Sequence, residues 1–298
     1  MQARAEITDF WAMVFNPSSM DRLFHVWIGA FLAGAFLVLS VHAWYLLHNK
    51  HVELSRRAFK IALAVATLSS LAQLLSGHQS AEGVAVNQPA KLAAMEGHFD
   101  SLAVAPAYVF GWVDKEEQQV SGLGIPGGLS FLLYGDTETP VQGLNSFPED
   151  ERPTALNAIF QFYHLMVAIG MFLIALTLYA CFQWWRGRLF QQRWLLWVFV
   201  VAVLAPNIAN QIGWYTAEMG RQPWVVYGLL RTSDALSETV TANQVLFSLI
   251  MFTIVYTLLF ALFIYLLNKK IQAGPGSGKD IQHRALQEEM AEVVKRRT

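Results

Sequence analysis

Two apolar segments carry side chains that could hold a metal-bearing group inside a membrane. His25 begins the segment HVWIGAFLAGAF, and Gly29 follows four residues later, on the same face if the segment is helical. A histidine beside a small residue leaves room for a flat macrocycle, and histidine with methionine is one axial ligand pair of haem iron. In the segment YHLMVAIG, His164 and Met166 are two residues apart. On a helix they point about 200° apart, so only one of them can face a given partner.

Each of these residues also has a purely structural interpretation. His25 could pack in the interior, and the small residues of GAFLAG could form a contact face between helices. Met166 could simply fill apolar space. An ionisable residue inside a membrane is costly, however, and this favours a function for His25. His42 lies about 25 Å further along the same predicted helix, so it cannot share the same macrocycle.

The segment NQPAKLAAMEGHF places a base, Lys91, five residues before an acid, Glu96. A pair of this kind near the membrane surface could bind and deprotonate a polar head group. The alternative is a solvated amphipathic helix whose charges have no chemical role.

The stretch GWYTAEMGRQPW lies between two apolar runs and contains a second pair of opposite charges. Trp214 and Glu218 are four residues apart and Glu218 and Arg221 are three apart, so on a helical turn they are neighbours. Pro223 then interrupts the turn. A salt bridge at a helix end is the structural alternative, but a charged pair beside a bilayer is costly, which favours a function.

The elements that must position these residues are membrane-spanning helices. Of the 298 residues, 54% are hydrophobic and only 14% are charged, whereas about a quarter are charged in soluble domains. The apolar residues form runs of about 20, the length that crosses a hydrocarbon layer of about 30 Å. The fold class is therefore predicted to be all-α, a polytopic membrane protein with a long loop over 77–156. Five spans are predicted, over residues 23–47, 58–76, 157–184, 194–212 and 244–267.

The basic residues predict how the spans are oriented. Lys and Arg concentrate between the first two spans, between the third and fourth, and after the fifth, whereas the 77–156 loop is mainly acidic. The positive-inside bias places the basic loops and the C-terminus in the cytoplasm, and the N-terminus and the long loop outside. No signal peptide is expected, because the N-terminal residues include acids and lack a compact apolar core. The net charge of −1 gives no indication of nucleic acid binding, and the single cysteine, Cys181, excludes a disulfide framework.

Four segments together resemble subunit I of the cytochrome bd quinol oxidases. They are DFWAMVFNPSSMDRLFHVWIGAFLAGAF, GHQSAEGVAVNQPAKLAAMEG, FQFYHLMVAIG and GWYTAEMGRQPW, they occur in the order of that subunit, and the resemblance covers nearly the whole chain. The resemblance implies that His25 and Met166 are the axial ligands of the low-spin haem b. It also implies that Lys91 and Glu96 oxidise quinol and that Glu218 ligates the high-spin haem b.

The resemblance assigns three further residues to the surroundings of the haems. Trp214 would be a packing or electron-path residue, and Arg221 would be a partner of a haem propionate. His164 stands where the best-known members of the family have arginine. An imidazole could still donate to a propionate, but it would neutralise less charge than a guanidinium.

One large difference from the family concerns length. The familiar subunit has nine spans, and this chain has counterparts only of the last five. The first four carry the ligand of haem d, so haem d is expected only if a partner supplies that ligand. The expected partners are a second integral membrane subunit and a separate chain with the four missing helices. A truncated subunit I is the alternative.

The predicted function is the haem- and quinol-binding subunit of a cytochrome bd-type terminal oxidase in a bacterial or archaeal cytoplasmic membrane. It would oxidise quinol at the outer face and pass electrons towards the reduction of oxygen to water. A quinol-linked haem b subunit that does not reduce oxygen, and a membrane scaffold without redox activity, stay open. The predicted segments are an outer N-terminus (1–22), two spans (23–76), an outer quinol-binding loop (77–156), two spans (157–212), an outer haem-ligand connection (213–243), one span (244–268) and a charged cytoplasmic tail (269–298).

Overall fold

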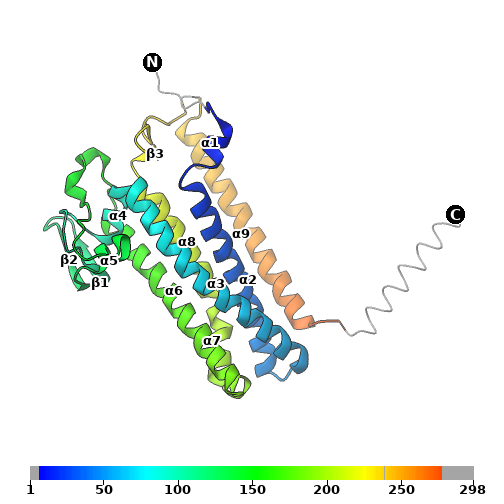
Figure 1. Cartoon of the computed structure of the whole chain (residues 1–298). Coiled ribbons are helices and arrows are strands. Elements are labelled where there is room, and N and C mark those ends of the chain that lie inside the picture. Colours follow the sequence, from blue (N-terminus) through cyan, green and yellow to red (C-terminus); the bar gives the residue numbers. More distant parts are fainter. Residues whose placement is uncertain (1–6, 238, 277–298) are drawn as a thin grey trace. The chain divides into compact units, whose positions relative to one another are not determined.

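A computed structural model describes residues 7–237 and 239–276, and Figure 1 shows their helices and strands. Within these residues, five helical stretches are long and apolar enough to cross a membrane, which confirms the all-α fold class and the five predicted spans. Parts of the predicted N-terminal segment and tail, residues 1–6 and 277–298, lie outside the described residues. The elements are α1 (Phe10–Val14), α2 (Ser19–Leu47), α3 (Val52–Asn87), α4 (Pro89–Glu96), β1 (Ala107–Asp114), β2 (Gln119–Ile125), α5 (Gly128–Tyr134), η1 (Leu144–Ser146), η2 (Glu149–Glu151), α6 (Leu156–Trp185), η3 (Leu189–Gln191), α7 (Arg193–Ala202), α8 (Leu204–Gly220), β3 (Trp224–Val226), β4 (Leu230–Arg231) and α9 (Ala242–Ala273).

The second span is longer than its apolar run. Helix α3 has 36 residues and continues through the polar residues 77–87, which the sequence had suggested would belong to the loop. At 1.5 Å per residue it is about 54 Å long, well above the thickness of a hydrocarbon layer. It ends where Gln88 precedes Pro89, because a residue before proline is disfavoured in the helical conformation. Pro89 then begins α4, at a position where its missing N–H costs nothing.

The fourth span consists of two helices separated at Val203. Helix α7 ends at Ala202, four residues before Pro206. A proline ring clashes with the carbonyl four residues before it and cannot donate to that carbonyl, so the break falls where proline requires it. The side-chain amide of Asn207 donates to the Val203 carbonyl at 2.8 Å, which is a further contact at the start of α8.

Helices α2, α3, α6 and the α7–α8 pair form a four-helix bundle in which each packs on the next, so that α2 and α6 stand at opposite corners (Figure 1). One end of the bundle is filled by a buried apolar cluster, which we call the apolar end. The other end carries α4, and we call it the α4 end. The buried members of the cluster are Leu32, Ala35, Phe36, Leu39, Ala43, Leu46, Leu47, Phe59, Ala62, Leu63, Ala66, Leu173, Leu176, Ala180, Leu189, Leu195, Leu196, Phe199 and Ala202.

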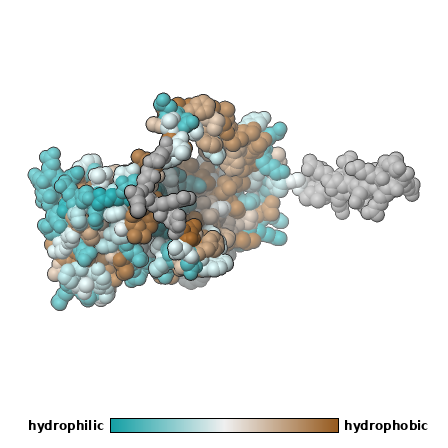
Figure 2. All heavy atoms as spheres, turned by 90° about the horizontal axis from the view of Figure 1, so that it is seen from above, coloured by the Kyte–Doolittle hydropathy of each residue, from teal (hydrophilic) through white to brown (hydrophobic). Residues whose placement is uncertain are grey.

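The segment between α4 and α6 is ordered rather than an open loop. Strands β1 and β2 form an antiparallel hairpin, with Trp112 opposite Ser121, and α5 follows. The hairpin is tied to the first turns of α6, because the Val113 N–H donates to Asn157 Oδ1 (3.1 Å) and Gln161 Nε2 donates to the Gly111 carbonyl (2.6 Å). In Figure 2 the visible face of this part, on the left, carries many hydrophilic residues, although the hairpin also exposes Phe110, Trp112 and Leu123.

The remaining described elements follow α8. Strands β3 and β4 form a short hairpin, and Arg231 in β4 forms an ion pair with Asp150 in η2 (2.7 Å). Helix α9 belongs to a separate compact unit, residues 237–298, and is considered by itself. It begins with a capping box, in which Thr241 and Gln244 satisfy each other's backbone N–H groups.

Candidate functional site

Helix α4 is buried along almost its whole length. All seven residues from Ala90 to Glu96 are buried, so the alternative of a solvated amphipathic helix is wrong. The helix ends at Gly97, whose φ of 72° is a left-handed conformation that favours glycine. Lys91 and Glu96 are about 140° apart around this helix, so they face different neighbours. No ion pair joins the two side chains within the part of the chain that the structure describes.

Lys91 faces α8. Its aliphatic stem lies against Gly220, where a Cβ would be only 3.0 Å from Lys91 Cγ, so any larger residue at this position would displace the lysine. Burial is the main cause that lowers the pKa of Lys91 to about 8. The charges of Arg22 and Arg221 lower the pKa further, while that of Glu218 raises it. The lysine is therefore a buried cation that loses its proton more easily than an exposed one.

Glu96 faces α6. Only 5% of it is exposed, and its side chain is hydrogen-bonded to Tyr163. Burial raises the pKa of Glu96 to about 7, whereas the bond from the tyrosine acts in the opposite direction. A carboxyl group with a pKa near neutrality can accept a proton and release it again at physiological pH.

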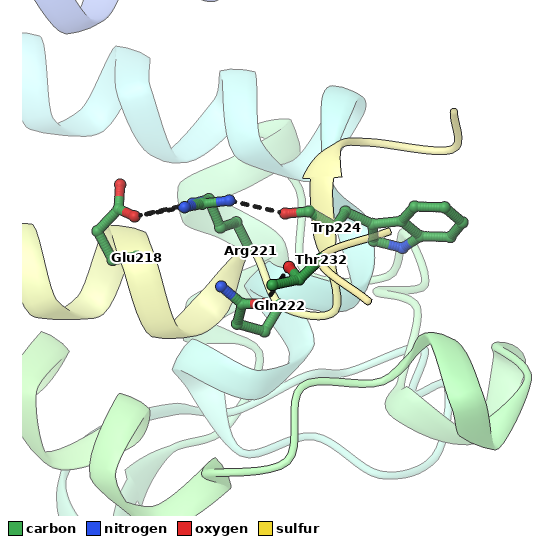
Figure 3. A network of polar contacts seen from close by, with 5 residues as sticks. All are labelled: Glu218, Arg221, Gln222, Trp224 and Thr232. Atoms are coloured by element: carbon green, nitrogen blue, oxygen red, sulfur yellow. Dashed lines mark hydrogen bonds and ion pairs between the residues drawn. The ribbon is translucent and has the colours of Figure 1, made fainter. Parts of the chain in front are cut away.

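Glu218 and Arg221 at the end of α8 form the pair that their spacing predicts (Figure 3). Arg221 Nη2 and Nε lie 2.7 and 2.9 Å from the same carboxylate oxygen, Oε2. Arg221 Nη1 also donates to the Trp224 carbonyl at 2.9 Å, which ties α8 to β3. Both side chains are only partly buried. Trp214 is exposed and lies against the ring of Tyr215, so it does not join this network.

His25 in α2 faces α3 at the α4 end of the bundle. Gln73 Nε2 donates to His25 Nε2 at 2.7 Å, and His25 Nδ1 lies 2.7 Å from the Ser76 hydroxyl. Because Nε2 accepts, the proton of a neutral imidazole is on Nδ1 and is donated to Ser76. The other amide atom of the glutamine, Gln73 Oε1, is buried without a hydrogen-bond partner among the described residues. Gly77 lies beside the ring, where a Cβ would be 3.7 Å from His25 Cε1.

Contacts with α8 place Met166 and His25 at similar depths in the bundle. A Cβ on Gly213 would lie 2.7 Å from Met166 Sδ, and a Cβ on Gly29 would lie 2.8 Å from Asn210 Oδ1. Asn210 and Gly213 are three residues apart on α8, which is about 4.5 Å along the axis. His25 is one turn beyond Gly29, or about 6 Å. The levels of the two side chains along α8 therefore differ by only about 1.5 Å.

His164 is held by the backbone. Its Nδ1 lies 2.8 Å from the Phe160 carbonyl and its Nε2 lies 3.0 Å from the Tyr108 carbonyl in β1. A neutral imidazole has one N–H donor, so only an imidazolium can donate to both carbonyls. In this structure the histidine joins β1 to α6, and its proposed contact with a haem propionate stays a prediction.

Several residues around these side chains were not singled out in the sequence. Tyr163, Gly213 and Gly220 lie within the quoted segments FQFYHLMVAIG and GWYTAEMGRQPW, and the three-residue spacing of Tyr163 and Met166 was a usable signal. Gln73 and Ser76 had no local signal, because they are ordinary polar residues in a helix and gain their meaning only from the contact with His25.

The sequence profile of cytochrome bd terminal oxidase subunit I matches residues 1–275. The chain belongs to the cytochrome bd terminal oxidase subunit I family. It is 33% identical over 281 residues to cytochrome bd ubiquinol oxidase subunit 1 of Bacillus subtilis, a match that covers 91% of this chain and 60% of the relative. It is 30% identical over 340 residues to cytochrome bd-II ubiquinol oxidase subunit 1 of Escherichia coli, covering 92% and 66%.

A solved structure, the bd oxidase of Geobacillus thermodenitrificans, is similar to this cytochrome bd subunit I chain. The TM-score is 0.80 at 31% identity, and the match covers 90% of this chain and 61% of the other. The chain therefore spans about three fifths of the length of the bd oxidase subunits that it matches. Membership of the cytochrome bd family implies haem cofactors and a multi-pass membrane protein.

Proposed function

We propose that this chain oxidises quinol at α4 and passes the electrons to haem between α2 and α6, as part of a cytochrome bd-type terminal oxidase. One observation carries the proposal: α4 and Met166 contact the same face of α8. Lys91 contacts α8 at Gly220 and Met166 contacts it at Gly213. These positions are seven residues, or about 10 Å, apart along the helix. A proton-accepting site and a haem site would thus be neighbours.

The surroundings of His25 support its assignment as a haem ligand. Histidines that ligate metals usually donate their other ring N–H to a neighbouring acceptor, which fixes the tautomer. Ser76 can serve as that acceptor for Nδ1, which leaves the lone pair of Nε2 for iron. Gln73 faces that lone pair in this structure and would move aside. Its buried oxygen, which lacks a partner among the described residues, is compatible with a group that belongs beside it.

Met166 is proposed as the second axial ligand of the low-spin haem b. It lies at the corner of the bundle opposite α2 and near the depth of His25, and both side chains are half-buried. Because Gly29 and Gly213 lack side chains, Asn210 and Met166 can approach the helices there. When bound, the haem supplies a centre that takes electrons one at a time, and a thioether ligand raises its reduction potential.

Glu218 is proposed as the ligand of the high-spin haem b. Both contacts from Arg221 fall on Oε2, so Oε1 is the atom that we assign to the iron. Arg221 would give up one of its contacts with Glu218 and bind a haem propionate instead. Trp214 would pack beside the haems. His164 would donate to a propionate of the low-spin haem by giving up one of its contacts with the Phe160 and Tyr108 carbonyls.

Quinol oxidation releases two protons and two electrons. We assign one proton to the Glu96 carboxylate, because burial raises its pKa to about 7. The other proton leaves to the solvent on the same side. Lys91 donates a hydrogen bond to a quinol oxygen and stabilises the negative charge that develops there as the proton departs.

The orientation in the membrane and the partners belong to the same proposal. The α4 end faces outward, because the loops at the apolar end carry the basic residues Lys50, Arg186 and Arg188. Oxygen would be reduced to water by the complete assembly. This assembly would include a second integral membrane subunit and a chain with the helices of the relatives that this chain does not match. Haem d is present where one of these supplies its ligand. Proton release outside and uptake inside would conserve about 2.3 kcal/mol per charge per 100 mV.

The test is Glu96→Gln in the purified oxidase complex, with Glu82→Gln as the matched control. Glu82 is also a glutamate of this region, but it is half exposed and pairs with His78. We expect quinol:oxygen turnover to fall about 10²–10⁴-fold in Glu96→Gln, because the general base is lost. Turnover should be unchanged in the control, and the reduced-minus-oxidised haem spectrum should be unchanged in both. Wild-type turnover of Glu96→Gln would contradict the proposal.

A further inference from the structure

Tyr163 lies on α6 with its hydroxyl at the carboxyl group of Glu96. The tyrosine ring packs on the buried apolar cluster around α4, so its position is fixed by neighbours on several elements. The buried members of this cluster are Ala93, Ala94, Met95, Phe99, Val113, Leu144, Leu156, Ile159 and Phe160.

The other elements packed on α4 bring no competing charge to Glu96. From α8, Glu218 and Arg221 act on Lys91 instead. On α3, the pair of His78 and Glu82 is half exposed, and Val84 is the residue that packs on the cluster. Helix η1, residues 144–146, has no titratable side chain.

His98, two residues after Glu96, is also bonded elsewhere. Its Nε2 lies 3.1 Å from the Pro106 carbonyl. Within the described residues, no cation forms an ion pair with Glu96. The Tyr163 hydroxyl is therefore the polar group that supports the ionised form of this carboxyl.

Tyr163 is also close to the proposed haem site. It precedes Met166 by three residues on α6, so the two side chains are neighbours on one helix face. The tyrosine thus lies between the proposed proton acceptor on α4 and the proposed iron ligand on α6.

We propose that Tyr163 is a positioning residue for quinol oxidation, whose hydroxyl donates to the Glu96 carboxylate and holds it ready to accept the proton of quinol. This inference rests on the proposed function of Glu96. The hydroxyl does not give up its proton in the step. The quinol proton goes to Glu96, and the tyrosine keeps the receiving carboxylate ionised and directed at the substrate.

The test is the pH profile of quinol oxidation in the Tyr163→Phe complex. A hydrogen bond donated to a carboxylate favours the ionised form, so its loss raises the pKa of Glu96 above about 7. Because Glu96 must be ionised to accept a proton, the acid limb of the profile should move to higher pH, by about one unit. Turnover should fall several-fold below pH 7 and recover towards the wild-type value above pH 8 by the same reasoning.

The matched control is Tyr179→Phe. It removes the same atom from the same helix, at the other end, where the hydroxyl donates to Gln192 Oε1 at 3.3 Å. Its pH profile should coincide with that of the wild type. A second readout is the infrared band of the protonated Glu96 carboxyl, which should persist to higher pH in Tyr163→Phe and shift in frequency.

Two results would overturn the inference, and they differ from failure of the proposed function. Coincident pH profiles of Tyr163→Phe and Tyr179→Phe, or an unchanged infrared band, would contradict a positioning role for Tyr163. If Glu96→Gln also kept full turnover, the assignment of the proton acceptor itself would be wrong. If Glu96→Gln were inactive while the Tyr163→Phe profile stayed in place, only the present inference would fail.

Discussion

At the apolar end of the bundle, Phe36 and Phe59 pack on Phe199, with ring centroids 6.1 and 5.1 Å from its own. At the α4 end, the corresponding interior positions hold His25 and Met166, together with small residues. The first arrangement is complete in itself, because apolar side chains need only shape and volume to pack. The second leaves His25 and Met166, the proposed haem ligands, only half-buried, and the buried Gln73 Oε1 has no hydrogen-bond partner among the described residues. The comparison indicates that the apolar end stabilises the bundle, whereas the α4 end keeps polar side chains that suit the haem proposed there.

The largest difference between the two ends is expected when a proposed haem ligand at the α4 end is removed. His25→Ala should abolish the low-spin haem signal, because it removes one of the two proposed axial ligands. The matched change at the apolar end is His42→Ala, which removes a histidine of the same helix whose Nδ1 lies 3.2 Å from the Ser55 hydroxyl. Reduced-minus-oxidised spectra of both purified variants provide the measurement. A low-spin signal that survives in His25→Ala, or disappears in His42→Ala, would refute the ligand assignment.

At the apolar end, a large loss of folding stability is expected when an aromatic core residue is removed. Phe199→Ala should destabilise the protein by about 3–5 kcal/mol, since it leaves a cavity between two aromatic rings. Thermal unfolding of the purified complex measures this loss. Phe182→Ala is the control, because Phe182 is 45% exposed and should cost far less. At low temperature the haem spectrum of Phe199→Ala should match that of the wild type, and an altered spectrum would show that the two ends are not independent.

A smaller effect is expected from a glycine substitution beside Met166 at the α4 end. Gly213→Ala brings a methyl group within 2.7 Å of Met166 Sδ and should weaken haem retention by about 1–3 kcal/mol, because the thioether must shift. The control is Gly170→Ala on α6, where a new Cβ meets no atom within 4 Å. The rate of haem loss to an apo-globin acceptor measures the difference. Equal rates in the two variants would mean that Gly213 does not shape the haem site.

Most of the fold could be predicted from hydropathy, but the ends of the helices could not. The runs of apolar residues predicted that the second span ends at residue 76 and the fourth at residue 212. In the structure, α3 continues to Asn87 and α8 to Gly220. A run of apolar residues marks only the part of a helix that lies in the hydrocarbon layer. Backbone hydrogen bonding continues through polar residues until the chain meets a residue that interrupts it, which here is Pro89 for α3.

The candidate site could be predicted only in part. The spacing of Glu218 and Arg221 predicted their contact, since neighbours on one helix follow from helical geometry alone. The spacing of Lys91 and Glu96 could not reveal that α4 is buried or that its two charges face α8 and α6. That outcome depends on how three helices approach one another, which no local pattern records.

Taken alone, the order of residues determined that this chain crosses a membrane, which segments do so, and which side chains have the chemistry for haem and quinol. The first two properties follow from composition and from the length of the apolar runs, whereas the assignment to haem and quinol follows from the resemblance to the cytochrome bd family. Only the tertiary structure decided that Glu96 is buried against Tyr163, that Ser76 holds one nitrogen of His25, and that Gly213 and Gly220 admit Met166 and Lys91 to α8. Each of these contacts joins residues far apart in the chain, so they arise only when the packed helices bring the residues together.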